Sequence, residues 1–363
     1  MEPDSTFATG SSGAAKTVDD DTGRRALMLI DLPNLSRVGD QLWQRYGTPD
    51  KLDNARRLAE LTAACAERID AFPWRIVLEP GNLCNLHCKE CPTHESDLPK
   101  GLLDPADIET YLQDLWPHLV QVNLFNWGEP VLNPRLPEII EIIHRREVGT
   151  QVHANMNRFP EALMGRVIDS GLDFLVASID GVSETAYAGY RVGGSAKQSL
   201  ENLERFVKLR DARGTSTPKI VWRFLCFPHT LDEIDQARRL AADIGVDDFA
   251  LGEGFLDGRI WTSDGPKSYL DNPSEQSVPY CNDLFDFPVI HWDGTVLPCC
   301  YVADRRFIWG DLRQSSWRDI FNRAAFRKAR RLVAGDTSVE CPCRGCFKIP
   351  KLVQLSVSGE AHE

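Results

Sequence analysis

Leu83-Cys84-Asn85-Leu86-His87-Cys88-Lys89-Glu90-Cys91-Pro92 is the stretch around which this chain is organised. It follows a strand-like run at residues 74–79, so its three cysteines are expected on a tight loop at the end of a strand. Three thiolates with this spacing can converge on one metal centre, but a closed zinc site takes four protein ligands and a four-iron cluster held by protein alone takes four cysteines. The loop therefore predicts a metal centre with one open coordination position. A zinc knuckle or a group of inert, reduced cysteines is the alternative.

The composition limits the class of protein. A chain of 363 residues suggests about two domains, and 42% hydrophobic with 26% charged residues is ordinary for a soluble globular protein. The net charge of −12 argues against a nucleic-acid partner, which needs basic surface. No apolar run reaches the length of a membrane span and no signal-peptide core is present, so we expect a cytoplasmic protein with no membrane partner. The eleven cysteines then indicate thiolate ligands in a reducing compartment.

The N-terminal part precedes the expected catalytic domain. Residues 1–25 carry too little apolar surface to offset the entropy of ordering, which predicts a disordered tail. Residues 26–73 form an expected helical extension, in which residues 54–69 show apolar side chains at helical spacing. Cys65 lies on that apolar face, so we expect it in the core.

Short apolar runs alternate with amphipathic segments over residues 74–261. Alternating β and α units predict parallel strands with right-handed crossovers, and six such units fit an incomplete α/β barrel. Ligands of such sheets lie at the carboxyl ends of the strands, where each motif described below falls. The expected strands are 74–79, 119–125, 149–155, 173–179, 219–227 and 247–252, and the expected helices are 105–115, 134–147, 159–170, 196–213 and 230–244.

Polar motifs follow three of these strands. Gly128-Glu129-Pro130 follows the second, where a glycine lets the backbone approach a ligand while the acid receives an ammonium group; a plain helix-starting turn is the alternative. Asn155 follows the third strand, where asparagine is also a common turn residue. Ser178 and Asp180 end the fourth strand, with Arg191 further along, and Asp180 could equally cap a helix.

Two further side chains end the fifth and sixth strands. Cys226 either fills space as a small hydrophobe or faces the substrate as a hydrogen-atom donor. Glu253 either faces the barrel mouth as a general base or is an exposed loop acid.

A second group of cysteines follows an expected linker at residues 262–280. Asp293-Gly294 lies between two apolar runs and predicts a β-hairpin, which would bring Cys281 and Cys299 toward one locus. A basic helix is expected at residues 316–333, followed by Cys341, Cys343 and Cys346.

The cysteine loop resembles the cluster loop of the radical S-adenosylmethionine (radical SAM) superfamily. The resemblance implies that Cys84, Cys88 and Cys91 hold a [4Fe–4S] cluster whose fourth iron binds the amino and carboxylate groups of S-adenosylmethionine. Glu90 stands where the family usually has an aromatic or apolar residue that packs near adenine.

The polar motifs extend this resemblance. Trp127 and Gly128-Glu129-Pro130 are similar to the family's GGEP motif, with Trp127 in place of the first glycine, and would cradle the methionyl amino group. Asn155 lies in a turn similar to the Thr-Asn-Gly turn that relatives place near the cofactor. The S-x-D-G and R-x-G-G stretches imply that Ser178 binds the ribose hydroxyls and Arg191 the methionyl carboxylate.

Residues 281–350 resemble the SPASM/twitch extension, with Gly294 and Cys299 in register with its hairpin motif. The chain has too few cysteines for two auxiliary clusters, so it looks like the shorter twitch form with one auxiliary [4Fe–4S] cluster. Its expected ligands are Cys281, Cys299, Cys343 and Cys346. Cys341 is the rival of Cys343, Cys300 is expected to point off the opposite face, and a four-cysteine zinc site is the alternative. Residues 351–363 are an expected tail.

The resemblance also implies a reaction. Electron transfer from the reduced first cluster, supplied by a flavodoxin- or ferredoxin-type donor, splits S-adenosylmethionine into methionine and a 5′-deoxyadenosyl radical that removes a hydrogen atom from a small-molecule substrate. We expect oxidation of a carbinol carbon of a sugar or aminocyclitol, typical of natural-product pathways, because a closed auxiliary cluster accounts for the departing electron. The alternatives are a radical epimerase with Cys226 as hydrogen donor, a ribosomal-peptide maturase, and a non-enzymatic, zinc-binding interaction protein.

Overall fold

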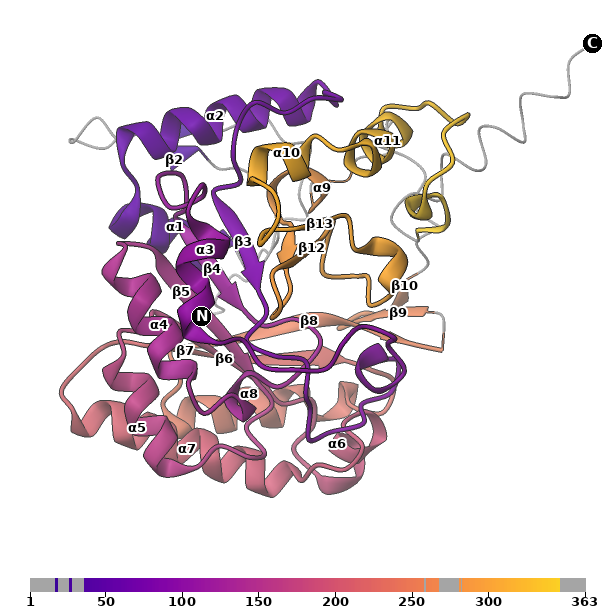
Figure 1. Cartoon of the computed structure of the whole chain (residues 1–363). Coiled ribbons are helices and arrows are strands. Elements are labelled where there is room, and N and C mark those ends of the chain that lie inside the picture. The colour runs from indigo at the N-terminus through magenta and orange to yellow at the C-terminus, as the bar shows by residue number, and fades with distance from the viewer. Residues whose placement is uncertain are drawn as a thin grey trace, which may run out of the picture.

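The computed structural model describes residues 36–257, 259–267, 281 and 283–346, together with two short strands nearer the N-terminus (Figure 1). These strands, β1 (Thr17–Val18) and β2 (Ala26–Leu27), pair antiparallel. The remaining parts of the expected tails, residues 1–25 and 351–363, lie outside the described residues.

The N-terminal extension contains two helices, α1 (Ser36–Tyr46) and α2 (Pro49–Ala63). Thr48 caps α2, because its side-chain oxygen accepts the N–H of Lys51 at 3.3 Å. The helix predicted over residues 54–69 is therefore present, but it begins earlier and ends sooner. Cys65 follows it and packs, half-buried, against the main core.

Six parallel strands, adjacent in chain order, form the centre of the molecule. They are β3 (Arg75–Leu78), β4 (Gln121–Leu124), β5 (Gly149–Ala154), β6 (Phe174–Ser178), β7 (Lys219–Cys226) and β8 (Asp248–Leu256). All six coincide with strands expected from the sequence, which confirms the α/β class and the partial barrel.

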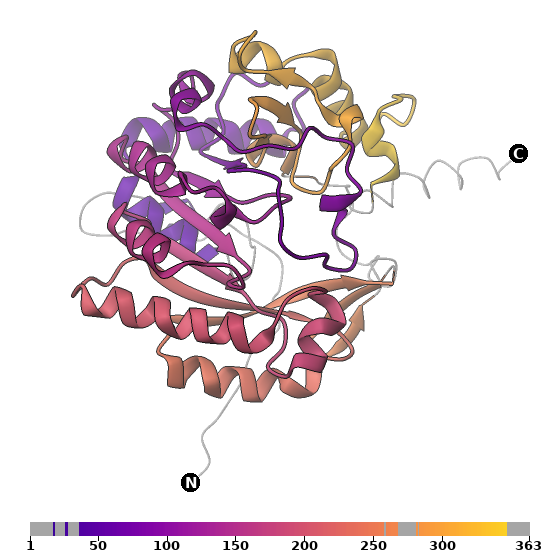
Figure 2. The same ribbon diagram turned by 60° about the horizontal axis from the view of Figure 1, so that its bottom comes forward.

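Helices connect these strands on the outer side of the sheet. They are α3 (Ile108–Leu112), α4 (Leu136–Arg145), α5 (Glu161–Asp169), α6 (Glu184–Tyr190), α7 (Ala196–Ala212) and α8 (Ile234–Ile244). Short 3₁₀ turns lie at Pro92–His94, Pro105–Asp107, Pro130–Leu132 and Leu231–Glu233. Of the six helices, α6 was not expected. The long helices α7 and α8 run along the outside of the strands (Figure 2).

The strand register divides the side chains between two faces. One row, Leu124, Val152, Leu175 and Ile220, is fully buried in the helix-covered core. The opposite face forms the inside of the partial barrel, because side chains alternate along each strand, and it carries polar side chains among apolar ones such as Val176 and Val221. Its members include Asn123, Gln151, His153, Ser178 and Arg223.

Further strands extend both edges of this sheet. Next to β8 lie β9 (Arg259–Thr262) and β10 (Gly265–Lys267), which pair antiparallel, so the first residues of the expected linker 262–280 form a strand. At the other edge, β11 (Val289–Ile290) pairs parallel with β3 and continues into β12 (Thr295–Leu297) and β13 (Gly310–Asp311). The predicted hairpin is confirmed, and it joins the C-terminal region directly to the barrel sheet.

Three helices cover the C-terminal strands (Figure 1): α9 (Asp283–Asp286), α10 (Trp317–Phe321) and α11 (Ala324–Val333), with 3₁₀ turns at Arg305–Phe307 and Pro342–Gly345. The single helix expected over residues 316–333 is interrupted at Asn322. The side chain of Asn322 binds the backbone N–H and carbonyl of Ile69, at 2.9 and 2.8 Å, which holds the break against the N-terminal extension. No helix in the described part of the chain is long and apolar enough to cross a bilayer.

Candidate active site

The cysteine loop lies at the carboxyl end of β3 and is held from two sides. The N–H of His87 donates to the carbonyl of Val192, after α6, at 2.8 Å. The Nδ2 of Asn155, after β5, donates to Oδ1 of Asn85 at 3.1 Å. The loop is therefore fixed by the segments that follow two other barrel strands, β5 and β6.

Cys84, Cys88 and Cys91 are close enough to interact electrostatically with one another. Among the described residues, no three His, Cys, Asp or Glu side chains converge tightly enough to hold a single metal ion. An iron–sulfur cluster binds each thiolate on a different iron atom, so its sulfurs stand further apart than the ligands of one zinc ion. Three thiols on one loop can hold three irons of a four-iron cluster and leave the fourth without a protein ligand.

Gly128 lets a second backbone pass close to this loop. A Cβ atom at this position would lie 2.3 Å from the carbonyl oxygen of Gly81 and 2.7 Å from Cα of Asn82, so a side chain would push the two segments apart. The next N–H, of Glu129, donates to the carbonyl of Leu83 at 2.8 Å. Glycine at position 128 therefore allows the motif to pack closely against the segment that leads into the cysteine loop.

The carboxylate of Glu129 is buried beside the loop. It accepts the N–H of Asn155 at 2.8 Å and that of Val131 at 3.4 Å. Burial raises the pKa of Glu129 to about 7, although these hydrogen bonds and the positive charge of Arg191 oppose the rise. No lysine, arginine or histidine of the described chain forms an ion pair with it. A buried carboxylate without a cationic partner fits the ammonium group of S-adenosylmethionine.

Arg191 lies between this site and Asp180. Its Nε and Nη2 each lie 2.6 Å from Oδ2 of Asp180, and its Nη1 lies 3.9 Å from Sγ of Cys88. Asp180 is therefore an ion-pair partner, and Ser183 caps α6 instead by accepting the N–H of Ala186 at 3.2 Å. The remaining guanidinium nitrogen of Arg191, Nη1, lies on the side of the thiols and can donate to a ligand.

Trp127, which replaces a glycine of the family motif, has a contact that the sequence did not predict. Its indole Nε1 donates to the carbonyl of Val302 at 2.9 Å, in the segment after Cys299-Cys300. Ser96 Oγ donates to the carbonyl of the next residue, Ala303, at 2.6 Å. Two residues near the cysteine loop thereby hold the C-terminal region against the barrel.

The remaining predicted site residues lie on opposite faces of the sheet. Ser178 lies on the barrel-interior face, in register with Arg223. Cys226 alternates onto the other face, with Trp222 and Phe224, and is 1% exposed; burial raises the pKa of its thiol to about 11. Glu253 is in register with Cys226 and is exposed. The strand register thus does not bring Cys226 or Glu253 to the side of the sheet that carries Ser178.

A second set of thiols gathers beside the β11–β12 hairpin. Cys281, Cys299, Cys341 and Cys343 interact electrostatically, and a side-chain hydrogen bond joins Cys341 to Cys343. Cys346 ends the same 3₁₀ turn, with its N–H donating to the carbonyl of Cys343 at 3.0 Å. Both rivals for one ligand position, Cys341 and Cys343, therefore lie at the same locus.

Cys300 packs elsewhere. It lies against a separate apolar cluster that includes Val77, Val289 and Leu297, whereas Cys281, Cys341, Cys343 and Cys346 pack against the main core. Cys300 still lies close enough to Cys299 to interact with it electrostatically, so its orientation away from the auxiliary ligands stays a prediction.

A buried ionic network joins the two cysteine regions, and the sequence analysis missed it. Nε2 of His291 lies 2.7 Å from Oε2 of Glu79, the residue after β3, and Nδ1 lies 3.5 Å from Oδ1 of Asp293. Burial alone would lower the pKa of His291, but its close contacts with Asp293 and Glu79 and their negative charges raise it to about 9. The imidazole is therefore protonated at neutral pH. The sequence signal for this network was that Glu79 and His291 each directly follow an apolar strand.

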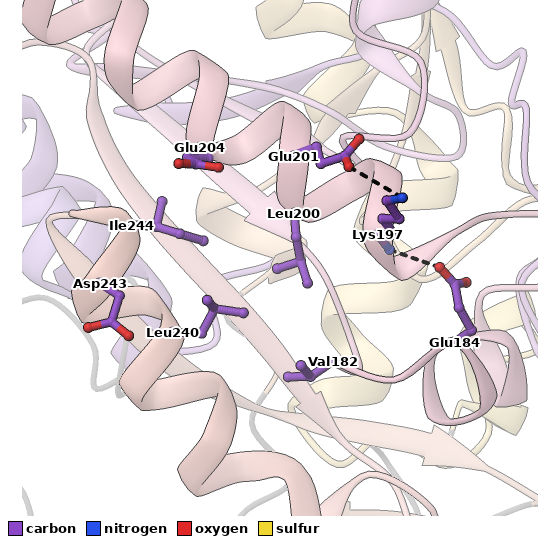
Figure 3. A pocket seen from close by; sticks show the side chains of 9 residues that line it. All are labelled: Val182, Glu184, Lys197, Leu200, Glu201, Glu204, Leu240, Asp243 and Ile244. Carbon is purple, nitrogen blue, oxygen red and sulfur yellow. Dashed lines mark hydrogen bonds and ion pairs between the residues drawn. The ribbon is translucent and has the colours of Figure 1, made fainter.

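A cavity of about 420 Å³ lies on the outer side of the sheet (Figure 3). Leu200, Leu240 and Ile244 form its apolar floor between α7 and α8, and acidic side chains form much of its rim. It is separated from the barrel interior by the sheet, and no cysteine lines it. The candidate active site is therefore the interior face of the sheet at the cysteine loop.

Two family models match the chain. That of the radical SAM superfamily matches residues 78–241, and that of an iron-sulfur cluster-binding domain, SPASM, matches residues 281–347. The chain therefore belongs to the radical SAM superfamily, in the branch with a C-terminal SPASM domain. Its cofactors are S-adenosylmethionine, the radical SAM [4Fe–4S] cluster and auxiliary iron–sulfur chemistry in the SPASM domain.

Similar proteins include enzymes of different pathways. The tungsten-containing aldehyde ferredoxin oxidoreductase cofactor-modifying protein of Pyrococcus furiosus is 22% identical over 68% of this chain and 80% of its own length. The pre-heme d1 synthase of Dinoroseobacter shibae is 29% identical over 48% of this chain and 42% of its own length. Streptococcus suis SuiB bound to S-adenosylmethionine has a similar fold, with a TM-score of 0.58 and 15% identity over 82% of this chain and 76% of that one. These likenesses support a radical SAM enzyme and leave its substrate open.

Proposed function

We propose that this enzyme oxidises a carbinol carbon of a small polar natural-product substrate, a sugar or aminocyclitol, to a ketone. When bound, S-adenosylmethionine and its reduced cluster supply a 5′-deoxyadenosyl radical that abstracts the carbinol hydrogen. The auxiliary cluster would accept the electron that the substrate radical gives up together with a proton. The observation that carries this proposal is the second group of thiols, Cys281, Cys299, Cys341, Cys343 and Cys346, which can supply four protein ligands to one cluster.

The protein's residues have separate tasks in this proposal. Cys84, Cys88 and Cys91 hold the first cluster, and a flavodoxin- or ferredoxin-type donor reduces it. Glu129 binds the methionyl ammonium group, with Gly128 and Pro130 shaping the turn that carries it. Arg191 offers Nη1 to the methionyl carboxylate, and Asn155 orients Glu129 through its backbone N–H.

The auxiliary ligands in this proposal are Cys281, Cys299, Cys346 and one of the hydrogen-bonded pair Cys341 and Cys343. Four thiolates leave no iron open to substrate, which suits a cluster that accepts an electron. The pairing of β11 with β3 supports this role, because it joins the hairpin before Cys299 to the strand before the first cysteine loop.

The position of Cys226 favours oxidation over epimerisation. A hydrogen-atom donor has to face the substrate, whereas Cys226 shares the helix-covered face of β7 with Trp222 and Phe224. Glu253, on the same face, is likewise a weaker candidate for the proton acceptor than a group on the barrel interior.

A peptide substrate is the second candidate. SuiB bound to its precursor peptide SuiA has a fold similar to this chain, with a TM-score of 0.55 and 12% identity over 77% of this chain and 71% of that one. A peptide maturase would use the same two cysteine groups, so substrate trials have to include peptides.

The test is anaerobic incubation with reductant, S-adenosylmethionine and carbinol-deuterated sugars, aminocyclitols or peptides. Oxidation predicts deuterium in 5′-deoxyadenosine and a ketone two mass units lighter than the unlabelled alcohol. Cys299→Ala should keep 5′-deoxyadenosine formation and lose the ketone, whereas Cys226→Ala should keep both. Cys65→Ala, outside both thiol groups, is the matched control. An inverted alcohol that disappears in Cys226→Ala would instead identify an epimerase.

A further inference from the structure

Arg223 lies on the barrel-interior face in the carboxyl-terminal half of β7. The register places it beside Ser178, the last residue of β6, and beside Ala250 of β8. In a barrel of parallel strands this level, near the carboxyl ends, is where ligands bind. The residue was not singled out in the sequence, where it is the only charge in the run Ile220-Val221-Trp222-Arg223-Phe224-Leu225-Cys226.

The guanidinium of Arg223 has no protein partner among the described residues. It forms no hydrogen bond or ion pair with any described side chain. Three of the other buried arginines pair with carboxylates: Arg75 with Asp286, Arg191 with Asp180 and Arg210 with Asp247. Arg330 has no carboxylate partner among the described residues, but it donates to the carbonyl of Phe321 and lies 4.2 Å over its ring. A half-buried cation without an anion is costly unless a ligand supplies the negative charge.

The surroundings leave the guanidinium open to such a ligand. A Cβ atom on Gly252 would lie 2.9 Å from Nε and 3.3 Å from Nη2 of Arg223, so the glycine makes room for the side chain. His153 stacks on Phe125, with ring centroids 4.1 Å apart, and its Nε2 lies 2.6 Å from Nε2 of Gln151. Burial, and then the charge of Arg223, lower the pKa of His153 to about 3, so the neighbouring imidazole is neutral. Of Arg223 and His153, only Arg223 therefore carries a positive charge.

We propose that Arg223 binds an acidic group of the substrate, a carboxylate or a phosphate, and thereby makes this enzyme specific for acidic small molecules. Guanidinium binds both groups through two parallel hydrogen bonds, which also fixes orientation. This inference deepens the proposed function, on which it rests: the oxidised sugar or cyclitol would carry an acid, as a hexuronate or a sugar phosphate does. Arg191, held by Asp180 beside Cys88, serves the methionyl carboxylate instead.

The test measures binding, so it stays informative even if no ketone is found. Phenylglyoxal modifies unpaired arginines, and peptide mass spectrometry reads its reaction at Arg223 in the anaerobic holoenzyme. The ligands are S-adenosylmethionine alone, then S-adenosylmethionine with inorganic phosphate, glucuronate or glucose. Arg68, exposed after α2 and without a described partner, is the control for reagent strength. Titration calorimetry measures glucuronate and S-adenosylmethionine affinity in Arg223→Gln and Arg223→Lys, and iron content checks that both variants fold.

The proposal predicts that phosphate and glucuronate, added on top of S-adenosylmethionine, protect Arg223 but not Arg68, and that glucose does not. Arg223→Gln should weaken glucuronate binding by about ten- to hundredfold and leave S-adenosylmethionine binding within about twofold of wild type. Arg223→Lys, which keeps the charge, should lie between the two. Full protection by S-adenosylmethionine alone, with its affinity lost in Arg223→Gln, would assign the arginine to the cofactor and overturn the proposal. Equal protection by glucose would also overturn it. So would a result in which neither phosphate nor glucuronate protects Arg223.

Discussion

The carboxyl group of Glu129 is buried without an ion-pair partner among the described residues, and burial raises its pKa to about 7. Its hydrogen bonds come from two backbone N–H groups, which orient it toward the cysteine loop. A neutral group of the same shape would be cheaper to bury, so the acid is best explained by a cationic ligand. In the proposed function this ligand is the ammonium group of S-adenosylmethionine.

Glu129→Gln should lower the affinity for S-adenosylmethionine by about ten- to hundredfold, because a neutral amide replaces the charged acceptor. Calorimetric titration of the anaerobic holoenzyme measures this. In the wild type the affinity should also fall as the pH drops below the pKa of about 7, since the protonated acid no longer attracts an ammonium group. Glu253→Gln, the same change on the other face of the sheet, should have no effect. Equal affinities in the Glu129 variant and the wild type would remove Glu129 from the cofactor site.

At the scale of elements, the β11–β12 hairpin depends on one turn glycine. Gly294 has a φ of +80°, which strains any L-residue, and a Cβ atom there would lie 2.5 Å from the ring of Tyr111 in α3. Tyr111 is itself buried, so it cannot move aside easily. The hairpin therefore fits against α3 only with glycine at this position.

Gly294→Ala should destabilise the protein by about 2–5 kcal/mol, the sum of the left-handed backbone cost and the overpacking against Tyr111. Gly335→Ala provides the matched control, because Gly335 has a φ of +100° and nothing within 4 Å of an added Cβ. It should cost only about 1–2 kcal/mol. Urea unfolding of the anaerobic proteins compares the two midpoints. Equal losses would show that the contact with Tyr111 carries no energy.

Elements with a strong sequence period were predictable. The six barrel strands alternate with helices whose apolar spacing is clear, and the cysteine spacing located both thiol groups. The strands β9 and β10 were missed because residues such as Thr262, Gly265 and Pro266 have the composition of a linker. The break at Asn322 was missed because its cause, the backbone of Ile69, is remote in sequence.

Contacts within the site were less predictable for the same reason. The pairing of Arg191 with Asp180 depends on how the chain folds back after α6, and the exclusion of Cys226 from the interior face depends on strand register. A one-residue shift of β7 would exchange the faces of Cys226 and Arg223. The residue types of the site could therefore be read from the sequence, but which of them meet could not.

At the scale of the whole molecule, one continuous sheet joins the barrel to the SPASM domain. The parallel pairing of β11 with β3 places Glu79 and His291 side by side at its centre, and both are fully buried. Asn126, which precedes the Trp127-Gly128-Glu129 motif, donates to the other oxygen of Glu79 at 2.9 Å. The network therefore connects both cysteine regions with the cofactor motif, and the relative position of the two domains depends on it.

His291→Gln should destabilise the protein by about 3–5 kcal/mol, because Glu79 would remain buried without a counter-charge. The folded-state pKa of His291 is raised to about 9, above its unfolded value of about 6.5. The stabilisation from its proton is thus complete below pH 6.5 and is lost as the pH rises through 9. Urea unfolding from pH 6 to 9.5 should show this decline in the wild type and a flatter profile in the variant. Adding Glu79→Gln to His291→Gln should restore part of the lost stability, since it removes the unpaired charge. A variant that keeps the full decline with pH would show that another group carries it and that His291 does not join the two domains as an ion.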